Sequence, residues 1–192
     1  MKNLLIWLPL LLIVCTACSE DTPSPSEDYY IKFNVDGKTV RYTGTSLSPS
    51  SFNFDQNFQV YNAVVQVIAP GSDGTNSFVN ILLRNESAIE TNKLYKLTDG
   101  IQIASFKQPR ILFTWADEKG DIYNAVLLKD SYPNLEIKDE AELTFTKIGN
   151  EVLEGKFSAS LIGPVSAATG RGNATKIISG GEFRVKFINS NP

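Results

Sequence analysis

The chain has 192 residues, a formal net charge of −3 and no histidine. Without histidine it has no Ser-His-Asp or Cys-His catalysis and no imidazole ligand for zinc. The charge balance is mildly acidic and there is no basic cluster, which argues against nucleic acid as a partner. One domain fits the length, and a chain of this size can bury most of its apolar surface without disulfides or metal ions.

The first seventeen residues have the pattern of a bacterial export signal. Lys2 supplies the positive charge, and Leu4 to Val14 form the apolar segment. This segment is shorter than the roughly 20 apolar residues that a membrane-spanning helix requires, and it contains Pro9. We therefore expect residues 1–17 to be removed as a signal peptide.

The sequence that ends this segment is Cys15-Thr16-Ala17-Cys18, which resembles the lipobox of bacterial lipoproteins. The resemblance implies that the Cys18 thiol receives a diacylglyceryl group and that the new amino terminus is then acylated. Several acyl chains anchor a protein strongly, because each buried methylene contributes about 0.8 kcal/mol. An ordinary secretory signal with two incidental cysteines is the alternative. After cleavage at Cys18 the chain has no free thiol and forms no disulfide.

The segment after the cysteine has the composition of a flexible tether. Residues 19–28 read SEDTPSPSED, without apolar side chains and with two prolines. The acidic Ser19-Glu20-Asp21 resembles the surface-export signal of Bacteroidota lipoproteins. That resemblance implies an outer-membrane protein displayed on the cell surface, with a periplasm-facing orientation as the alternative. The predicted organisation is a signal peptide (1–17), an acylated cysteine with its tether (18–28) and one folded domain (29–192).

The folded domain begins with a clear hairpin pattern. Apolar side chains recur at every second position over residues 29–35, which is typical of a β-strand. Asp36-Gly37 then supplies the positive φ angles of a two-residue turn, and Val40 and Tyr42 continue the returning strand.

The middle of the chain contains further strand patterns. Residues 57–69 carry apolar side chains on both faces, which indicates a central strand or a bulge near Tyr61. Shorter strands are expected over residues 78–83, 94–97, 110–116 and 122–128. Ile111, Phe113 and Trp115 share one side of their strand, and the turn Asp117-Glu118-Lys119-Gly120 follows it.

The carboxyl-terminal third alternates most regularly. Leu143 and Phe145 point one way, Gly149-Asn150 makes a turn, and residues 153–161 and 183–187 continue the alternation. Residues 163–173 are rich in small side chains, and we predict a mobile loop there. About ten strands without helical crossovers predict an all-β fold, a two-sheet antiparallel β-sandwich of jelly-roll or immunoglobulin-like topology.

Two groups of residues in the mature sequence form a recognisable pattern: Phe33, Val35, Asp36, Gly37 and Lys38 near one end, and Gly155, Lys156, Phe157, Ser158, Ile178, Gly181 and Phe183 near the other. In these residues the sequence resembles a family of uncharacterised Bacteroidota β-sandwich lipoproteins. The matching residues are hairpin turns and core aromatics. The resemblance therefore implies a fold and a cellular location, and it implies no catalytic residues.

Acidic residues cluster twice, at Asp117, Glu118 and Asp121 and at Asp139, Glu140 and Glu142. Such pairs could serve a carboxylate-based glycoside hydrolase, but both clusters fall in predicted turns or strand starts, where acids solvate the chain. A calcium site at Asp117 and Asp121, or at Asp73, is a second hypothesis, because hard cations bind several oxygens from one loop. Neither cluster has EF-hand spacing.

Three aromatic residues are candidates for ligand binding, where they would stack on sugar faces: Trp115, Tyr123 and Tyr132. The alternative for Trp115 is a place in the core beside Ile111 and Phe113, because the three share parity. Tyr132-Pro133 falls in a predicted loop, where a ring is free to bind.

The sequence thus favours a non-catalytic, surface-displayed module that binds glycan or protein, without a cofactor. A structural or adhesin-type assembly subunit, in which an edge strand pairs with a partner, is the first alternative. A carboxylate-based glycoside hydrolase is the second.

Overall fold

A computed structural model describes residues 29–44 and 50–189 of the chain. These residues form thirteen β-strands and two short 3-10 helices, which confirms the prediction of an all-β fold. No helix within these ranges has the length and apolarity needed to cross a membrane. The predicted signal peptide, the lipidated Cys18 and the tether fall in residues 1–28, outside the described residues.

The strands follow one another through short connections. Their bounds are β1 (Tyr30–Val35), β2 (Lys38–Thr43), β3 (Ser50–Asp55), β4 (Val60–Ile68), β5 (Phe78–Asn85), β6 (Leu94–Lys96), β7 (Ile101–Ile103), β8 (Phe106–Gln108), β9 (Ile111–Ala116), β10 (Ile122–Ala125), β11 (Glu140–Ile148), β12 (Val152–Ser166) and β13 (Gly170–Asn189). The 3-10 helices are η1 (Leu97–Asp99) and η2 (Lys129–Ser131).

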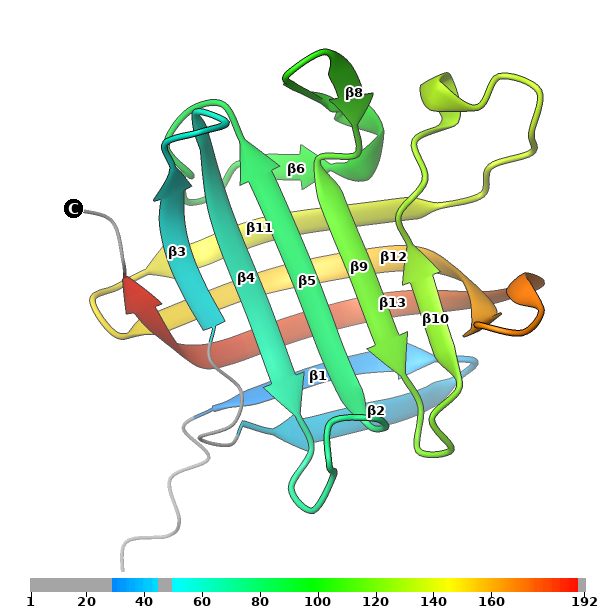
Figure 1. Ribbon diagram of the computed structural model, residues 1–192. Coiled ribbons are helices and arrows are strands. Elements are labelled where there is room, and N and C mark those ends of the chain that lie inside the picture. The colour runs from blue at the N-terminus through cyan, green and yellow to red at the C-terminus, as the bar shows by residue number, and fades with distance from the viewer. Residues whose placement is uncertain (1–28, 45–49, 190–192) are drawn as a thin grey trace, which may run out of the picture.

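Eleven strands belong to one continuous sheet, in the order β2-β1-β13-β3-β4-β5-β9-β10-β12-β11-β6. Because β12 also pairs with β13, the pairings from β13 through β3, β4, β5, β9, β10 and β12 form a closed circuit. Figure 1 shows two layers whose strands cross steeply, with β3, β4, β5, β9 and β10 in front and β1, β2, β11, β12 and β13 behind. A separate two-stranded sheet, β7-β8, stands at the top of the molecule.

The predicted β1–β2 hairpin is confirmed. Its turn residues Asp36 and Gly37 have φ angles of 50° and 75°, as a two-residue hairpin turn of this kind requires. Ile31, Phe33 and Val35 are buried, and the residues between them are exposed. The alternation of the sequence therefore gives the correct inward face of β1.

Aromatic side chains from both layers fill the core. The Phe33 ring of β1 lies with its centroid 5.9 Å from that of Trp115 in β9 and 5.9 Å from that of Phe157 in β12. Phe145 of β11 meets Phe52 of β3 edge-on at 5.5 Å. Each such pair adds roughly 0.5–1.5 kcal/mol beyond its buried area. These contacts hold the front and back layers together.

The β7–β8 hairpin covers one apolar residue on the outer face of β4, Val60. The register of β4 with its neighbours is continuous from Val60 to Ile68, so β4 is a central strand and the alternative of a bulge near Tyr61 is wrong. Val60 lies on the outer face by alternation, yet only 3% of its surface is exposed. Ile101 and Ile103 of the hairpin pack against it and form a small cluster separate from the main core.

The prediction of a mobile loop over residues 163–173 is wrong. Strand β12 continues to Ser166 and β13 begins at Gly170, and the two remain paired through Val165 and Arg171. Small residues are needed here because the backbones lie very close together: a Cβ on Gly172 would be 2.6 Å from the Gly163 carbonyl oxygen. The small side chains therefore mark close packing of two strands and not a loop.

Candidate functional site

The β7–β8 hairpin lies over the outer face of the front layer and borders two surface hollows. Its underside is anchored by the contacts of Ile101 and Ile103 with Val60. Its tip carries Phe106, which is 71% exposed. A single exposed ring of this kind is ordinary, but two such rings bordering one hollow mark a candidate binding surface. Figure 1 shows the hairpin standing between the β3–β4 end and the loop around η2.

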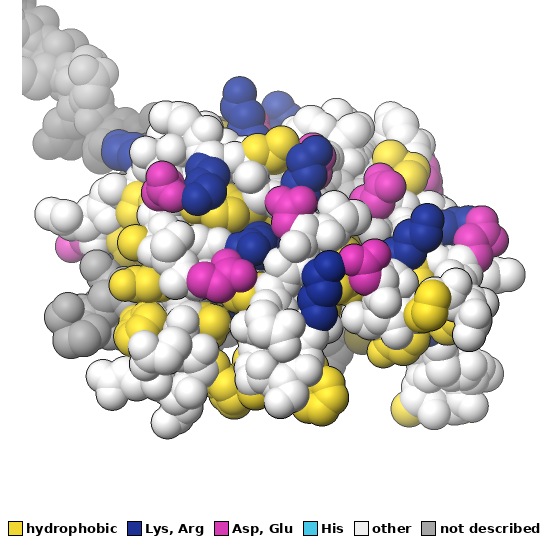
Figure 2. Space-filling model, turned by 90° about the horizontal axis from the view of Figure 1, so that it is seen from above, with side chains coloured by type: hydrophobic (Ala, Val, Ile, Leu, Met, Phe, Trp, Pro, Cys, Tyr) yellow, Lys and Arg dark blue, Asp and Glu magenta, His cyan; other side chains and the backbone are white. Residues whose placement is uncertain are grey.

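A hollow of about 490 Å³ lies on the β3–β4 side of the hairpin. Phe106 and Phe58, the latter 53% exposed in the β3–β4 turn, contribute to its apolar walls. Its polar lining comprises Asp55, Asn62, Arg84 and Gln108. Figure 2, which looks down on this end of the molecule, shows hydrophobic side chains exposed along one side, next to a band of mixed acidic and basic side chains. We refer to this hollow as the Phe58–Phe106 groove.

Among the described residues, Arg84 is the one cation that lines the Phe58–Phe106 groove. It projects from β5, and its Nη1 donates to Gln108 Oε1 at 2.5 Å. Burial lowers the pKa of the guanidinium below its usual value. The side chain remains a cation near neutral pH, because the normal pKa lies so far above it.

The other side of the hairpin borders a second hollow, of about 690 Å³. Tyr132, one of the three predicted ligand-binding aromatics, lines it and is 43% exposed. Lys107 of the hairpin forms an ion pair with Asp130 of η2 at 2.6 Å, which links the two sides of this hollow. Phe106 and Gln108 line both hollows, so the hairpin separates two adjoining surfaces.

Trp115 and Tyr123 lie together but away from Tyr132. Their rings stack in the core with centroids 5.7 Å apart, and they are only 5% and 7% exposed. The indole Nε1 of Trp115 donates to the Tyr42 hydroxyl at 3.2 Å. The structure thus places Trp115 in the core position that its parity with Ile111 allows, and only Tyr132 of the three presents a ring to solvent.

Asp117 and Asp121 lie in the β9–β10 turn, at the end of the molecule opposite the hairpin (Figure 1). Asp117 Oδ1 accepts the backbone N–H groups of Lys119 at 2.8 Å and Asp121 at 3.0 Å, so this carboxylate closes the turn. Asp73 acts in the same way on the N–H of Thr75, at 2.9 Å. The described residues contain no group of three or more His, Cys, Asp or Glu side chains placed to hold a metal ion. The calcium hypothesis stays a prediction.

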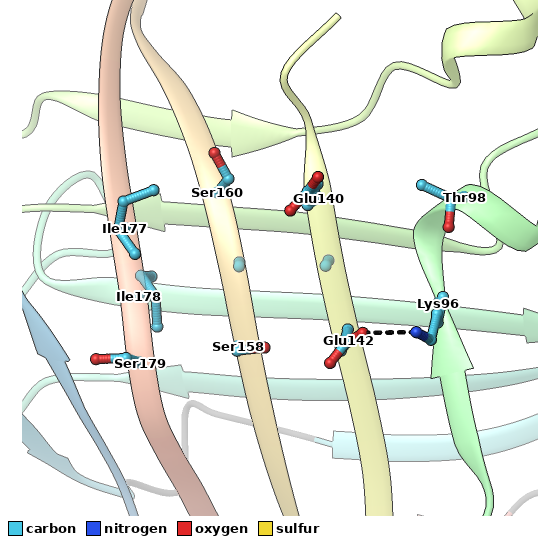
Figure 3. A pocket seen from close by; sticks show the side chains of 11 residues that line it. Lys96, Thr98, Glu140, Glu142, Ser158, Ser160, Ile177, Ile178 and Ser179 are labelled. Carbon is cyan, nitrogen blue, oxygen red and sulfur yellow. Dashed lines mark ion pairs between the residues drawn. The ribbon is translucent and has the colours of Figure 1, made fainter.

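The outer face of the back layer bears a trough of about 490 Å³, shown in Figure 3. It is lined by the hydroxyls of Ser158, Ser160 and Ser179, and no aromatic side chain lines it. Glu142 forms an ion pair with Lys96 at 3.0 Å, and Glu140 projects from the same strand on the same side. Two residues along a strand span about 6.8 Å, so these acids stand side by side and not across a cleft. This surface resembles the solvated outer face of an antiparallel sheet.

Asp139 and Arg171 form a buried pair that the sequence did not indicate. The Asp139 side chain is 1% exposed, and its carboxylate lies 2.6 Å from Arg171 Nη2. Asp139 Oδ2 also accepts the N–H groups of Val126 at 2.8 Å and Leu127 at 3.0 Å. The pair therefore ties both ends of the segment 126–139 to β13, so Arg171 is a fixed structural residue rather than part of a mobile loop.

No protein-family model matches the chain, and no curated protein or solved structure is significantly similar to it. The resemblance to Bacteroidota lipoproteins therefore stays a prediction. The function has to be argued from the groove itself, whose Phe58, Arg84 and Phe106 were not singled out by the sequence.

Proposed function

We propose that the protein is a lipid-anchored lipoprotein of the outer membrane, displayed on the cell surface, whose β domain binds a glycan without catalysis. The observation that carries the binding role is the pair of exposed rings, Phe58 and Phe106, that border one groove. Binding sites for small ligands combine apolar or aromatic walls with a few polar groups that fix orientation. Here the rings provide flat apolar surfaces for pyranose faces, and Asn62, Arg84 and Gln108 provide hydrogen bonds for hydroxyls.

The proposed lipid anchor and the proposed cell-surface location rest on the amino-terminal sequence. The apolar segment, the small Ala17 and Cys18 support lipidation, and the acidic residues that follow support display on the outer leaflet. A tether of ten residues, 19–28, would hold the domain off the membrane surface and leave the groove accessible to large glycans.

A structural or assembly role is the second candidate. Strand β2 is at an edge of the large sheet and pairs only with β1 among the described strands. An exposed edge of six residues offers backbone groups for pairing with a partner strand. Lys38 and Arg41 on this strand weigh against strand addition, because charged side chains are a common protection of edges.

For the fold, we propose an orthogonally packed two-sheet sandwich. The crossing of the two layers in Figure 1 and the inward alternation of their strands support this description. In such packings strands at the corners pair across the layers. The β13–β3 and β10–β12 pairings have that position in the strand order, which favours this form over the aligned layers of an immunoglobulin-like sandwich.

The test of the binding role is retention of the full-length chain, purified in mild detergent, on a panel of immobilised polysaccharides. We expect retention on at least one polysaccharide and a loss of at least about tenfold in affinity for Phe58→Ala and Phe106→Ala, because each removes one stacking surface. Ile177→Ala is the matched control, since Ile177 is 56% exposed on the opposite layer. No retention on any polysaccharide would reject the glycan-binding role, and equal losses in all three variants would reject the groove as its site.

A further inference from the structure

We propose that the glycan bound in the Phe58–Phe106 groove is acidic, and that Arg84 binds its carboxylate. This inference rests on the proposed function and specifies its ligand: a polysaccharide that contains uronic acid residues. It is carried by the position of one guanidinium in a groove that two exposed rings border, and by the lack of an ion-pair partner for that guanidinium among the described residues.

Arg84 is placed by sheet register. It lies opposite Asn62 of β4, which in turn lies opposite Asn53 of β3, so the three form an outward-facing row across the front layer. Asn62 Nδ2 donates to Asn53 Oδ1 at 2.9 Å. The β7–β8 hairpin covers the neighbouring Val60 and brings Gln108 within 2.5 Å of Arg84 Nη1. The guanidinium therefore has a hydrogen-bond partner at the wall of the groove.

Arg84 differs from other arginines of the described residues in its partner. Arg110 pairs with Glu86 at 2.9 Å, and Arg171 pairs with Asp139 at 2.6 Å. Arg84 has no carboxylate within ion-pair distance in the described part of the chain, and its side-chain partner there is the neutral amide of Gln108. A partly buried charge without a counter-charge is unfavourable, and a ligand carboxylate would relieve that cost.

Asp55 also lines the groove, and its carboxylate accepts hydrogen bonds from the backbone. Asp55 Oδ1 accepts the N–H of Asn57 at 2.9 Å and that of Phe58 at 3.2 Å. It thereby fixes the turn that presents the Phe58 ring and does not pair with Arg84. A guanidinium offers planar, paired donors that match the two oxygens of a carboxylate.

The cations of the other two hollows are already neutralised. Lys107, beside Tyr132, pairs with Asp130 at 2.6 Å, and Lys96, in the trough of Figure 3, pairs with Glu142 at 3.0 Å. The requirement for an anion is therefore specific to the Phe58–Phe106 groove among these three surfaces.

The test compares each acidic polysaccharide with its own neutral form. The probes are pectate, alginate and hyaluronan, each beside its methyl ester, and the protein is the full-length chain in detergent. We expect at least one acidic form to bind about tenfold or more tightly than its ester, because a charge-assisted hydrogen bond is lost on esterification. This comparison needs no variant and so does not depend on the folding of one.

Variants then assign the effect to Arg84. Arg84→Gln should weaken binding of the acidic form about tenfold and leave binding of the ester unchanged, and Arg84→Lys should retain part of the difference. Lys32→Gln is the control for net charge, because Lys32 is an exposed cation on β1. Melting curves of the variants check that the fold is intact.

The outcomes separate the two proposals. Equal binding of acidic and esterified forms, or retention only on neutral polysaccharides, would overturn the carboxylate inference and leave the glycan-binding role standing. An equal loss of both forms in Arg84→Gln would overturn the assignment to Arg84, since a merely structural residue would act in that way. Retention on no polysaccharide would overturn both proposals.

Discussion

Replacing Asp139 with asparagine should destabilise the protein strongly, because one buried carboxylate serves three groups. Its oxygens accept the N–H groups of Val126 and Leu127 and both terminal nitrogens of Arg171. Asparagine has one acceptor oxygen and turns an NH2 group toward either the backbone donors or the guanidinium. The substitution therefore leaves donors without partners and removes the charge that balances Arg171.

The loss of unfolding free energy can be estimated from the exposure of the Asp139 and Arg171 side chains. Removing one partner of a fully buried ion pair costs about 3–5 kcal/mol. The Arg171 side chain is 21% exposed, so water recovers part of its solvation. We therefore expect Asp139→Asn to lower the free energy of unfolding by about 2–4 kcal/mol. With a typical dependence of about 2 kcal/mol per molar urea, the midpoint should fall by roughly 1–2 M.

Urea unfolding followed by tryptophan fluorescence measures this shift. Trp115 is the only tryptophan after residue 17, and it is buried, so its emission reports on the core. The control is Asp130→Asn, which removes an exposed ion pair with Lys107 and should shift the unfolding midpoint much less, because water solvates both charges.

A double-mutant cycle tests the reasoning itself. Asp139→Asn combined with Arg171→Met removes both charges and keeps an acceptor oxygen at position 139, so its cost should be smaller than the sum of the costs of the two single substitutions, because no charge is left unpaired. The account is refuted if Asp139→Asn costs no more than the Asp130→Asn control, or if the effects of the two single substitutions simply add.

Single substitutions also test strand packing, a buried tyrosine and the anchor. Gly155→Ala should lower the free energy of unfolding by about 1–3 kcal/mol, measured by thermal unfolding, because the new Cβ would lie 2.4 Å from Phe183 Cζ. Gly149→Ala is the control and should cost less, because the nearest contact of its Cβ is at 3.3 Å. Equal costs of the two substitutions would contradict this reasoning. Burial raises the pKa of the Tyr42 hydroxyl above 10.0, so its contribution to the stability of the fold is fully present below pH 10 and is lost as the pH rises through the folded-state pKa. Tyr42→Phe should therefore flatten the loss of stability at alkaline pH, measured by urea unfolding at several pH values. An unchanged dependence of stability on pH would count against this prediction. Cys18→Ser should abolish the lipid mass in mass spectrometry and release the chain from membranes, whereas a wild-type chain without that mass would reject lipidation.

The parts of the fold that sequence predicts are those governed by neighbours along the chain. The Asp36-Gly37 turn and the inward positions of Phe113 and Trp115 are correct because both depend on local backbone geometry and on a period of two. The same holds for Leu143 and Phe145 of β11, both buried as the alternation indicates.

The parts that sequence misses depend on contacts between distant segments. The small residues from Gly163 to Gly172 look like a loop, yet they allow two backbones to approach closely. Strands β7 and β8 have three residues each, too few for alternation to be recognised. Arg171 falls in the predicted loop over residues 163–173, whereas in the structure it pairs with Asp139, 32 positions earlier in the chain.

The Phe58–Phe106 groove illustrates the same limit at the level of function. Its rings come from the β3–β4 turn and from the β7–β8 hairpin, and its cation comes from β5. Along the chain, Phe58 falls at the start of the strand expected over residues 57–69, Phe106 lies outside every expected strand, and Arg84 directly follows the strand expected over residues 78–83. None of these three residues indicates a binding site by itself, because a single exposed ring or surface arginine is common on proteins. The β7–β8 hairpin, by packing on Val60, brings Gln108 to Arg84 and adds Phe106 to the groove that Phe58 also lines. The chemistry of the groove is thus a product of the least predictable element of the fold, and a test of Arg84 is also a test of how that hairpin docks.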